Sequence, residues 1–341
     1  MFKTFQDNLL AFYQSFPIEK PWQADRDPYK IWLLEVLSQQ TRMEQALPYY
    51  RRLVDRFPKI ELLADASEDD LFALWKGLGY YSRARNLHNT AKYITSEREG
   101  QFPRTYADII KLNGVGPYTA SAIASFAFRE DVAVLDGNVH RVLSRVFGIA
   151  KTIQRGQDKD EFQNLANKLL IKGQSDIYNQ AIMNFGSTHC KPQNPNCGDC
   201  NISEICYAYQ NEKVGVLPPP KLRPILRDRY FHFVFVKSKD NIYLRKRMEK
   251  DIWQGLYEGV VQENKDLDVD FWQTQKLDIA GLLWSPWLKQ VLSHQRIWMK
   301  IAIIESENWS STNFQAFHTS ELKNIAFPRV VSKWIEAHGF D

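Results

Sequence analysis

The segment LNGVGPYTA, Leu112–Ala120, joins two stretches with helical patterns at residues 104–111 and 117–128. Gly114 and Gly116 make a Gly-x-Gly turn between them. Because glycine has no Cβ, such a turn lets the backbone N–H groups at the start of the second helix face a phosphate. A tight corner that only connects two helices explains the same residues, so the glycines alone are weak support for nucleic-acid binding.

Helical patterns extend over most of residues 1–213. The segment Tyr29–Met43 follows Pro28, a favoured first residue of a helix, and its apolar residues recur at helical spacing. Further helices are predicted at residues 68–76, 80–97, 138–148, 158–171 and 175–187. Strand-like alternation is scarce here, so we predict a mainly α-helical first domain over residues 1–213.

The composition changes at residues 214–229, VGVLPPPKLRPILRDR. Three consecutive prolines and several basic residues predict a semi-rigid, extended linker there. Beyond it we expect an α+β domain over residues 230–341, with strands at 230–238, 241–247 and 298–304 and a closing helix at 330–338.

Length and charge set broad limits on the protein. The 341 residues suffice for two domains, at about 150 residues each. The chain has 44 basic and 40 acidic residues, and its net charge of +4 is too mild to indicate a nucleic-acid partner by itself. Basic contacts to DNA would have to be clustered locally. No signal peptide and no apolar run of roughly 20 residues is visible, so we expect an intracellular protein of the cytoplasm.

All four cysteines, Cys190, Cys197, Cys200 and Cys206, lie close together at the spacing C-x6-C-x2-C-x5-C. Four thiols gathered in this way favour one four-thiolate site. The softness of sulfur narrows its occupant to zinc or an iron–sulfur cluster. Two disulfides are the alternative, which a reducing compartment disfavours.

A second motif, VLDGNVHRVLSRVFG (134–148), places Asp136 where the N-cap of a helix belongs, followed by Gly137 and Asn138. An aspartate in this position contributes about 1 kcal/mol to its helix, and capping alone would explain its presence.

Taken in order, a helix–hairpin–helix, a glycine-flanked aspartate and a four-cysteine loop resemble the helix–hairpin–helix superfamily of DNA glycosylases that carry a 4Fe-4S cluster. The longer strings PYKIWLLEVLSQQT (28–41), WKGLGYYSRARNLH (75–88) and YNQAIMNFG (178–186) look like the MutY family of adenine-specific mismatch glycosylases. The resemblance covers nearly the whole chain. It implies a monomeric, monofunctional glycosylase of base excision repair that excises adenine opposite 8-oxoguanine or guanine in double-stranded DNA, with a 4Fe-4S cluster on the four cysteines.

Cleavage of the N-glycosidic bond to adenine needs a proton for the base and an anion near the sugar cation, as two carboxyl groups provide in glycoside cleavage. Glu35 lies on the apolar side of its helix, where burial should raise its pKa. Asp136 lies at a helix start, where backbone N–H groups should lower its pKa. The resemblance makes Glu35 the general acid and Asp136 the oxocarbenium stabiliser or transient nucleophile. A surface glutamate on an amphipathic helix is the alternative for Glu35.

Tyr118 and Asn138 flank this pair in the family and complete the catalytic set that the resemblance implies. In the related pyrimidine-damage lyases, such as endonuclease III, a lysine stands in place of Tyr118 and forms a Schiff base with the sugar. A phenol cannot form that imine, so Tyr118 favours a glycosylase without lyase activity. A pyrimidine-damage glycosylase/lyase stays the first alternative.

The resemblance also assigns residues to extrusion of the adenine from the base stack, which must precede its excision. Gln40 and Tyr80 match positions that wedge into the stack, and Trp22 lines the adenine pocket. Gly114 and Gly116 belong to the hairpin that binds DNA. A helix-end glutamine and a core tyrosine are the plain alternatives for the two wedge residues.

The segment NIYLRKRMEKDIWQGLYEGV (241–260) resembles the Nudix (MutT-like) fold. The carboxylate-rich helix that holds Mg2+ in hydrolases of that fold does not follow it. The resemblance therefore implies a domain that recognises 8-oxoguanine through Ser293 and His294, although Leu292 stands where the family's recognition loop usually has Phe. A polar turn at a strand end is the plain alternative for this loop. A nucleotide pyrophosphohydrolase and a non-catalytic DNA-binding module are the remaining alternatives for the protein.

Overall fold

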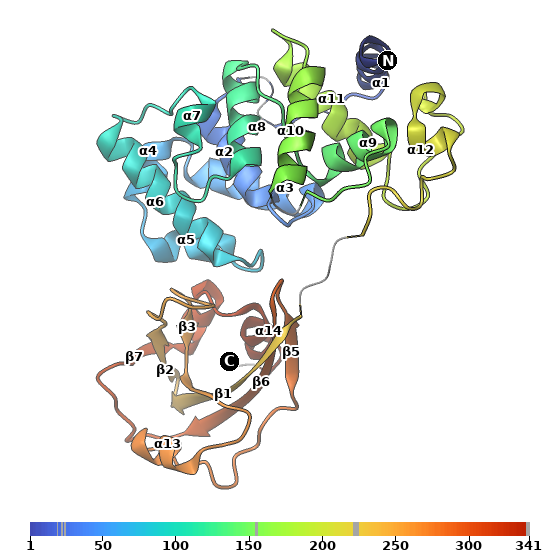
Figure 1. Cartoon of the computed structure of the whole chain (residues 1–341). Helices are drawn as coiled ribbons and strands as arrows, with labels where there is room; N and C mark the ends of the chain where they lie inside the picture. The colour runs from blue at the N-terminus through green and yellow to red at the C-terminus, as the bar shows by residue number, and fades with distance from the viewer. Residues whose placement is uncertain (19, 22, 24, 154–155, 221–224, 339–341) are drawn as a thin grey trace. The chain divides into compact units, whose positions relative to one another are not determined.

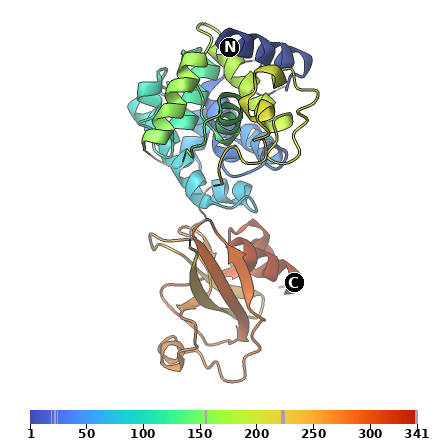
Figure 2. The same cartoon turned by 45° about the vertical axis from the view of Figure 1, so that its right-hand side comes forward.

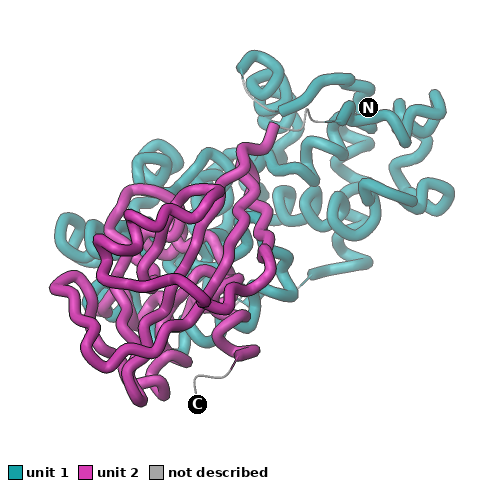
Figure 3. Tube along the Cα trace, turned by 90° about the horizontal axis from the view of Figure 1, so that it is seen from below, with its two compact units in different colours: residues 1–65, 86–222 teal, residues 66–85, 223–341 magenta. Residues whose placement is uncertain are grey.

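The computed structural model describes residues 1–18, 20, 21, 23, 25–153, 156–220 and 225–338. The chain divides into two compact units, one of residues 1–65 and 86–222 and the other of residues 66–85 and 223–341 (Figure 3). Residues 66–85, which the sequence analysis placed in the helical domain, are thus grouped with the C-terminal part of the chain. Within the described ranges, no helix has the length and apolar composition that crossing a membrane requires.

The first unit is built of helices, as the sequence predicts (Figure 1). They are α1 (Phe2–Ser15), α2 (Pro28–Ser38), α3 (Met43–Arg56), α4 (Ile60–Asp65), most of α6 (Tyr81–Glu97), α7 (Tyr106–Ile109), α8 (Pro117–Phe128), α9 (Gly137–Phe147), α10 (Gln157–Leu169), α11 (Ser175–Thr188), the 3-10 turn η1 (Ser203–Ile205) and α12 (Tyr207–Gln210).

Two of these helices form the centre of the unit. Every residue at 31–37 of α2 and at 119–126 of α8 is buried, and a helix that is buried all round belongs in the interior. The two helices pack against each other, and α11 packs against α8, α9 and α1. Residues of α2, α8 and α9 are therefore held on rigid, mutually supported elements.

The predicted helix over Tyr29–Met43 is wrong at its C-terminal end. The helix α2 ends at Ser38, and Met43 begins α3. Between them Gln40 has a φ of +55°, a left-handed conformation that cannot continue a right-handed helix.

The second unit contains α5 (Glu68–Trp75) and a mixed sheet (Figure 2). The strands are β1 (Arg227–Ser238), β2 (Asn241–Lys246), β3 (Tyr257–Glu258), β4 (Val260–Glu263), β5 (Leu288–Val291), β6 (Gln295–Glu305) and β7 (Gln315–His318). The helix α13 (Val269–Thr274) lies between β4 and β5, and the 3-10 helix η2 (Thr319–Asn324) and the helix α14 (Arg329–His338) follow β7. The order is β3-β2-β1-β6-β5, with β4 paired to β1 and β7 paired to β2. The strands and closing helix that the sequence predicts are confirmed, but β1 begins at Arg227, inside the predicted linker.

The apolar run of β1 is explained by burial on both faces of the sheet. Phe231, Phe233 and Phe235 pack toward α14, whereas Val234 and Val236 pack toward α13. The strand β6 runs parallel to β1, and Arg227 is paired with Gln295. The turn that carries Ser293 and His294 therefore lies at the end of the sheet where β1 begins.

Candidate active site and cysteine pocket

Glu35 is the one polar residue in the buried run of residues 31–37 of α2. The helix α2 begins at Pro28 behind Asp27, whose side chain accepts a hydrogen bond from the backbone N–H of Tyr29. Glu35 is only 7% exposed. Burial disfavours the charged form and raises the pKa of Glu35, as the sequence predicts.

Tyr118 reaches Glu35 from the hairpin. Gly114 has a φ of +75°, and a Cβ on it would lie 2.6 Å from the Cβ of Asn86, so the turn requires glycine. Gly116 is the N-cap of α8, which places Tyr118 in the first turn of that helix. The Tyr118 hydroxyl donates a hydrogen bond of 2.8 Å to Oε2 of Glu35. Burial and the neighbouring carboxyl groups raise the pKa of Tyr118, so the phenol keeps the proton it donates.

Asp136 caps α9, as the sequence predicts. Its Oδ1 accepts hydrogen bonds from the backbone N–H groups of Asn138 at 2.9 Å and Val139 at 2.7 Å. The Asn138 side-chain amide donates a third bond, of 2.8 Å, to Oδ2. Arg141 donates to Oδ1 of Asn138 at 2.9 Å, and this contact fixes the orientation of the amide, because arginine can only donate.

The predicted direction of the Asp136 pKa is wrong. Burial raises this pKa, and the hydrogen bonds from Val139 and Asn138 together with the charge of Arg141 lower it by less. The sequence places the group at a helix start but does not tell how strongly the folded protein desolvates it. The charge of Asp136 in turn raises the pKa of Glu35, so the two carboxyl groups share one electrostatic environment.

Two residues that the sequence motifs do not single out hold Asn138 in place. Gly186 lets α11 approach α9 closely, because a Cβ at this position would lie 2.8 Å from the Cβ of Asn138. Arg141 donates to the backbone oxygens of Gly186 at 2.7 Å and Cys190 at 2.8 Å, and so links α9, α11 and the cysteine segment. The last glycine of YNQAIMNFG and the arginine of LDGNVHRV are the signals that could have indicated them.

The residues predicted to wedge into DNA lie in surface turns. Gln40 is exposed in the turn after α2. Tyr80, with a φ of +52°, precedes α6 and is 42% exposed, which excludes the alternative of a core tyrosine. Trp22 lies outside the described residues.

The four cysteines line one pocket, and all four are free thiols. Within the described part of the chain, no three or more side chains are arranged as ligands of a metal ion. Burial raises the pKa of the Cys200 thiol to about 11, and repulsion from the neighbouring sulfurs adds to this. The Cys200 thiol therefore resists ionisation unless a cationic group compensates its charge, which is what a bound metal centre does.

Arg145, which the sequence motifs do not single out, is the basic residue beside these thiols. It is 3% exposed, and its Nη1 lies 3.4 Å from Sγ of Cys190. The guanidinium also donates to the backbone oxygens of Leu217 at 3.0 Å, Lys191 at 2.7 Å and Pro192 at 3.2 Å. Arg145 thus holds the cysteine segment against α9.

In the second unit, Ser293 and His294 are exposed in the turn between β5 and β6. The Ser293 Oγ lies 3.1 Å from Nδ1 of His294. Leu292 is partly buried and packs against the apolar cluster of the sheet.

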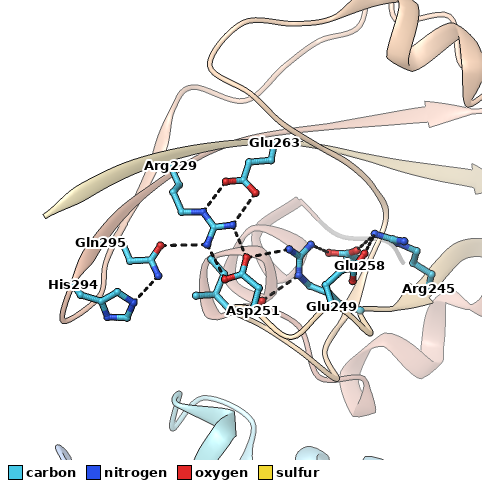
Figure 4. Close-up of polar contacts among 10 residues, drawn as sticks. Arg229, Arg245, Glu249, Asp251, Glu258, Glu263, His294 and Gln295 are labelled. Carbon is cyan, nitrogen blue, oxygen red and sulfur yellow. Dashed lines mark hydrogen bonds and ion pairs between the residues drawn. The ribbon is translucent and has the colours of Figure 1, made fainter.

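Carboxylates near this turn are paired with arginines (Figure 4). Glu258 accepts hydrogen bonds from Arg245 at 2.6 Å and from Arg247 at 3.1 Å. Asp251 and Glu263 both accept from Arg229.

Two families match separate parts of the chain. Residues 33–170 match the family described as HhH-GPD superfamily base excision DNA repair protein, and residues 231–337 match the NUDIX domain. The adenine DNA glycosylase of Buchnera aphidicola subsp. Schizaphis graminum is 33% identical over 259 residues, which cover 76% of this chain and 75% of that protein. The adenine DNA glycosylase of Mus musculus is 39% identical over 233 residues, which cover 66% of this chain and 45% of that protein.

Solved structures agree on the fold of the helical part. A thermostable thymine-DNA glycosylase matches with a TM-score of 0.58 and 27% identity, over 62% of this chain and 97% of that chain. An endonuclease III–DNA complex matches with a TM-score of 0.54 and 23% identity, over 62% of this chain and 98% of that chain.

Proposed function

The chain belongs to the adenine DNA glycosylases, base excision repair enzymes that cleave the N-glycosyl bond of adenine in DNA, and we propose that its substrate is adenine opposite 8-oxoguanine or guanine. The target adenine is extruded from the duplex before its bond is cut. The reaction is monofunctional, is carried out by a single copy of the chain and leaves an abasic site.

The contact between the Tyr118 hydroxyl and Glu35 is the observation that carries this proposal. Burial raises the pKa of Glu35 and so favours its protonated form, and because Tyr118 donates to Oε2, the acid proton is carried by Oε1. Glu35 passes that proton to a ring nitrogen of adenine while the glycosidic bond breaks and its electron pair leaves with the base. A neutral base is a far better leaving group than an anion.

Asp136 supplies negative charge beside the sugar cation. Two backbone N–H groups, the Asn138 amide and the charge of Arg141 all favour its carboxylate form. Glu35 has the Tyr118 hydroxyl and the charge of Lys20 to favour ionisation. In this proposal Asp136 acts as the carboxylate and Glu35 as the acid, the separate electrostatic and acid roles that the reaction requires. Its carboxylate stabilises the oxocarbenium ion or bonds to it briefly, until water adds to the sugar and returns a proton to Glu35.

Tyr118 also separates this reaction from that of a glycosylase/lyase. A lysine amine at this position would attack the sugar and form an imine, which a phenol cannot do. The Tyr118 hydroxyl is instead engaged with Glu35. Strand cleavage by β-elimination is not expected from this site.

The remaining predicted residues bind the substrate. Gly114 and Gly116 bring the backbone of the hairpin to a DNA phosphate. Gln40 and Tyr80 each wedge into the base stack. Ser293 and His294 of the Nudix-like domain contact the base opposite adenine. The pairing of Asp251, Glu258 and Glu263 with arginines supports a domain that has kept the fold without a hydrolytic Mg2+ site.

Cys190, Cys197, Cys200 and Cys206 would hold a 4Fe-4S cluster. The donor set fits, because it consists of four thiols that line one pocket with a buried guanidinium beside them. When bound, the cluster would compensate the charge of the thiolates and hold the four cysteines together. Arg145 and Arg141 position the segment that carries these ligands.

A labelled duplex that contains adenine opposite 8-oxoguanine tests the function directly. We expect strand breaks only after hot alkali, because the enzyme leaves an intact abasic strand. Breaks without alkali and a Schiff base that borohydride traps would instead indicate a lyase. Release of pyrophosphate from oxidised dGTP would indicate a hydrolase.

A further inference from the structure

A series of hydrogen bonds runs from the partly buried Arg229 to the surface turn of the second unit (Figure 4). Arg229 donates from Nε and Nη2 to Glu263, both at 2.7 Å, and from Nη1 and Nη2 to Asp251 at 2.9 and 2.5 Å. Nη1 also donates to Oε1 of Gln295 at 3.3 Å. All five N–H groups of the guanidinium have an acceptor, so Arg229 cannot rotate without losing hydrogen bonds.

The fixed guanidinium of Arg229 determines which way the side-chain amide of Gln295 points. Arginine has donors and no acceptor, so the amide atom that faces Arg229 must be the oxygen. Gln295 is 7% exposed, which leaves the amide little freedom. Its nitrogen faces His294, whose Nε2 lies 2.7 Å away. The Gln295 amide therefore donates, and Nε2 of His294 accepts.

Because Nε2 accepts, the directions of the remaining hydrogen bonds are also fixed. A neutral imidazole carries one hydrogen, so His294 must carry it on Nδ1. Nδ1 lies 3.1 Å from Oγ of Ser293 and donates to it. A hydroxyl that accepts this bond keeps its own hydrogen and one lone pair for a ligand. Ser293 is exposed, so a ligand can reach both.

We propose that Gln295 is a positioning residue that holds His294 in its Nδ1–H tautomer and so leaves the Ser293 hydroxyl able both to donate to a base and to accept from it. This inference rests on the proposed role of the turn in base recognition. The oxidised edge of 8-oxoguanine presents the C8 carbonyl beside an N7–H donor, whereas guanine presents N7 as an acceptor. A hydroxyl with one hydrogen and one lone pair matches both groups of 8-oxoguanine, but only one group of guanine.

Two substitutions of Gln295 interrupt this series of hydrogen bonds. Gln295→Glu keeps the shape and the oxygen that Arg229 binds, but a carboxylate can only accept, so neutral His294 must move its hydrogen to Nε2. The Ser293 hydroxyl then donates to Nδ1 and has no hydrogen left for a base. Gln295→Met keeps the size and removes the donor. Gln273→Glu, an exposed position of α13, is the control for the change in charge.

The first readout is the tautomer of His294. Nitrogen NMR of the full chain labelled at its 7 histidines, at alkaline pH, separates the two tautomers, and a His294→Asn spectrum assigns the signal. We expect the Nδ1–H form in the wild type and in Gln273→Glu, and the Nε2–H form in Gln295→Glu. An Nε2–H form in the wild type, or an unchanged tautomer in Gln295→Glu, would overturn the inference.

The second readout is the affinity for duplexes with adenine opposite 8-oxoguanine or opposite guanine, measured in an Asp136→Asn background. We expect both Gln295 variants to lose preference for 8-oxoguanine by roughly three- to tenfold, the worth of one hydrogen bond, and Gln273→Glu to keep it. An undiminished preference in both Gln295 variants would contradict the inference. If the turn does not recognise the base at all, the wild type itself will show no preference for 8-oxoguanine over guanine, and this result differs from an undiminished preference in the variants.

Discussion

The hydroxyl of Tyr118 donates a hydrogen bond of 2.8 Å to Oε2 of Glu35, and this bond joins the hairpin helix α8 to the buried carboxyl group of α2. Burial raises the pKa of Glu35, and the bond from Tyr118 opposes that shift. One phenol therefore orients the proposed acid and limits how strongly it holds its proton.

Replacing Tyr118 with phenylalanine keeps the ring and removes the donor. We expect the single-turnover rate of adenine excision to fall about tenfold, the worth of one hydrogen bond to an ionisable group. The carboxylate form of Glu35 loses a partner, so its pKa should rise further. The alkaline limb of the pH–rate profile, along which Glu35 loses its proton, should move to higher pH.

Tyr93→Phe is the matched control, because Tyr93 is 45% exposed on α6. Its rate and pH profile should equal those of the wild type. If the Tyr118→Phe profile also superimposes on the wild type, Tyr118 does not act on Glu35.

Asp136→Asn separates the charge of this residue from its capping role. Asparagine caps a helix as well as aspartate does, so the melting temperature should not fall. Excision should fall by about 10²–10³, because the sugar cation loses its anion, while affinity for the duplex is kept. Asp136→Ala should lose activity and also about 1 kcal/mol of stability with the cap. Wild-type turnover of Asp136→Asn would remove this carboxylate from the mechanism.

Glu35→Gln should abolish excision and stabilise the fold. Because folding raises the pKa of Glu35, the native state holds a proton that the unfolded chain releases once the pH exceeds the ordinary value of 4.5. Stability is therefore lost as pH rises from that value through the folded pKa, and a neutral glutamine avoids the loss. Thermal unfolding at pH 5 and pH 8 tests this. The gain in melting temperature should be larger at pH 8, and a lower melting temperature for the variant at pH 8 would contradict the assigned burial.

Local features of the site could be predicted from the sequence, and features that depend on packing could not. The capping role of Asp136 follows from the residues next to it, and the apolar neighbours of Glu35 indicate its burial. The predicted direction of the Asp136 pKa is wrong because desolvation in the folded protein, which the neighbouring residues do not reveal, outweighs the hydrogen bonds at the helix start. Arg145 was missed for a similar reason, since its acceptors lie on segments that meet α9 only in the folded chain.

Gly186→Ala should disturb the site through Asn138. The added Cβ would lie 2.8 Å from the Cβ of Asn138 and 3.0 Å from its backbone oxygen, so α11 and α9 must separate. We expect a loss of about 1–3 kcal/mol in unfolding free energy and slower excision, because Asn138 no longer holds Asp136. Gly137→Ala is the control, since a Cβ there meets no heavy atom within 4 Å. Equal melting temperatures for the two variants would show that the close approach is not required.

Arg145→Met should weaken the cysteine pocket, because it keeps the length of the side chain and removes the guanidinium. The backbone oxygens of Lys191 and Leu217 lose their donors, and the thiol of Cys190 loses its positive neighbour. Each buried carbonyl left without a donor costs about 1–3 kcal/mol, so the melting temperature should fall.

In Arg145→Met, the iron content per chain and the visible absorbance of the purified protein should also fall. The thiolates that hold a cluster need the cysteine segment in place and their own negative charge compensated. Arg145→Lys should be intermediate, because an ammonium keeps the charge but cannot reach several carbonyls at once. Lys172→Met, at an exposed position, should change neither quantity. Full iron content in Arg145→Met would mean that the four cysteines hold their cluster without help from α9, and an iron-free wild type would contradict the proposed cofactor itself.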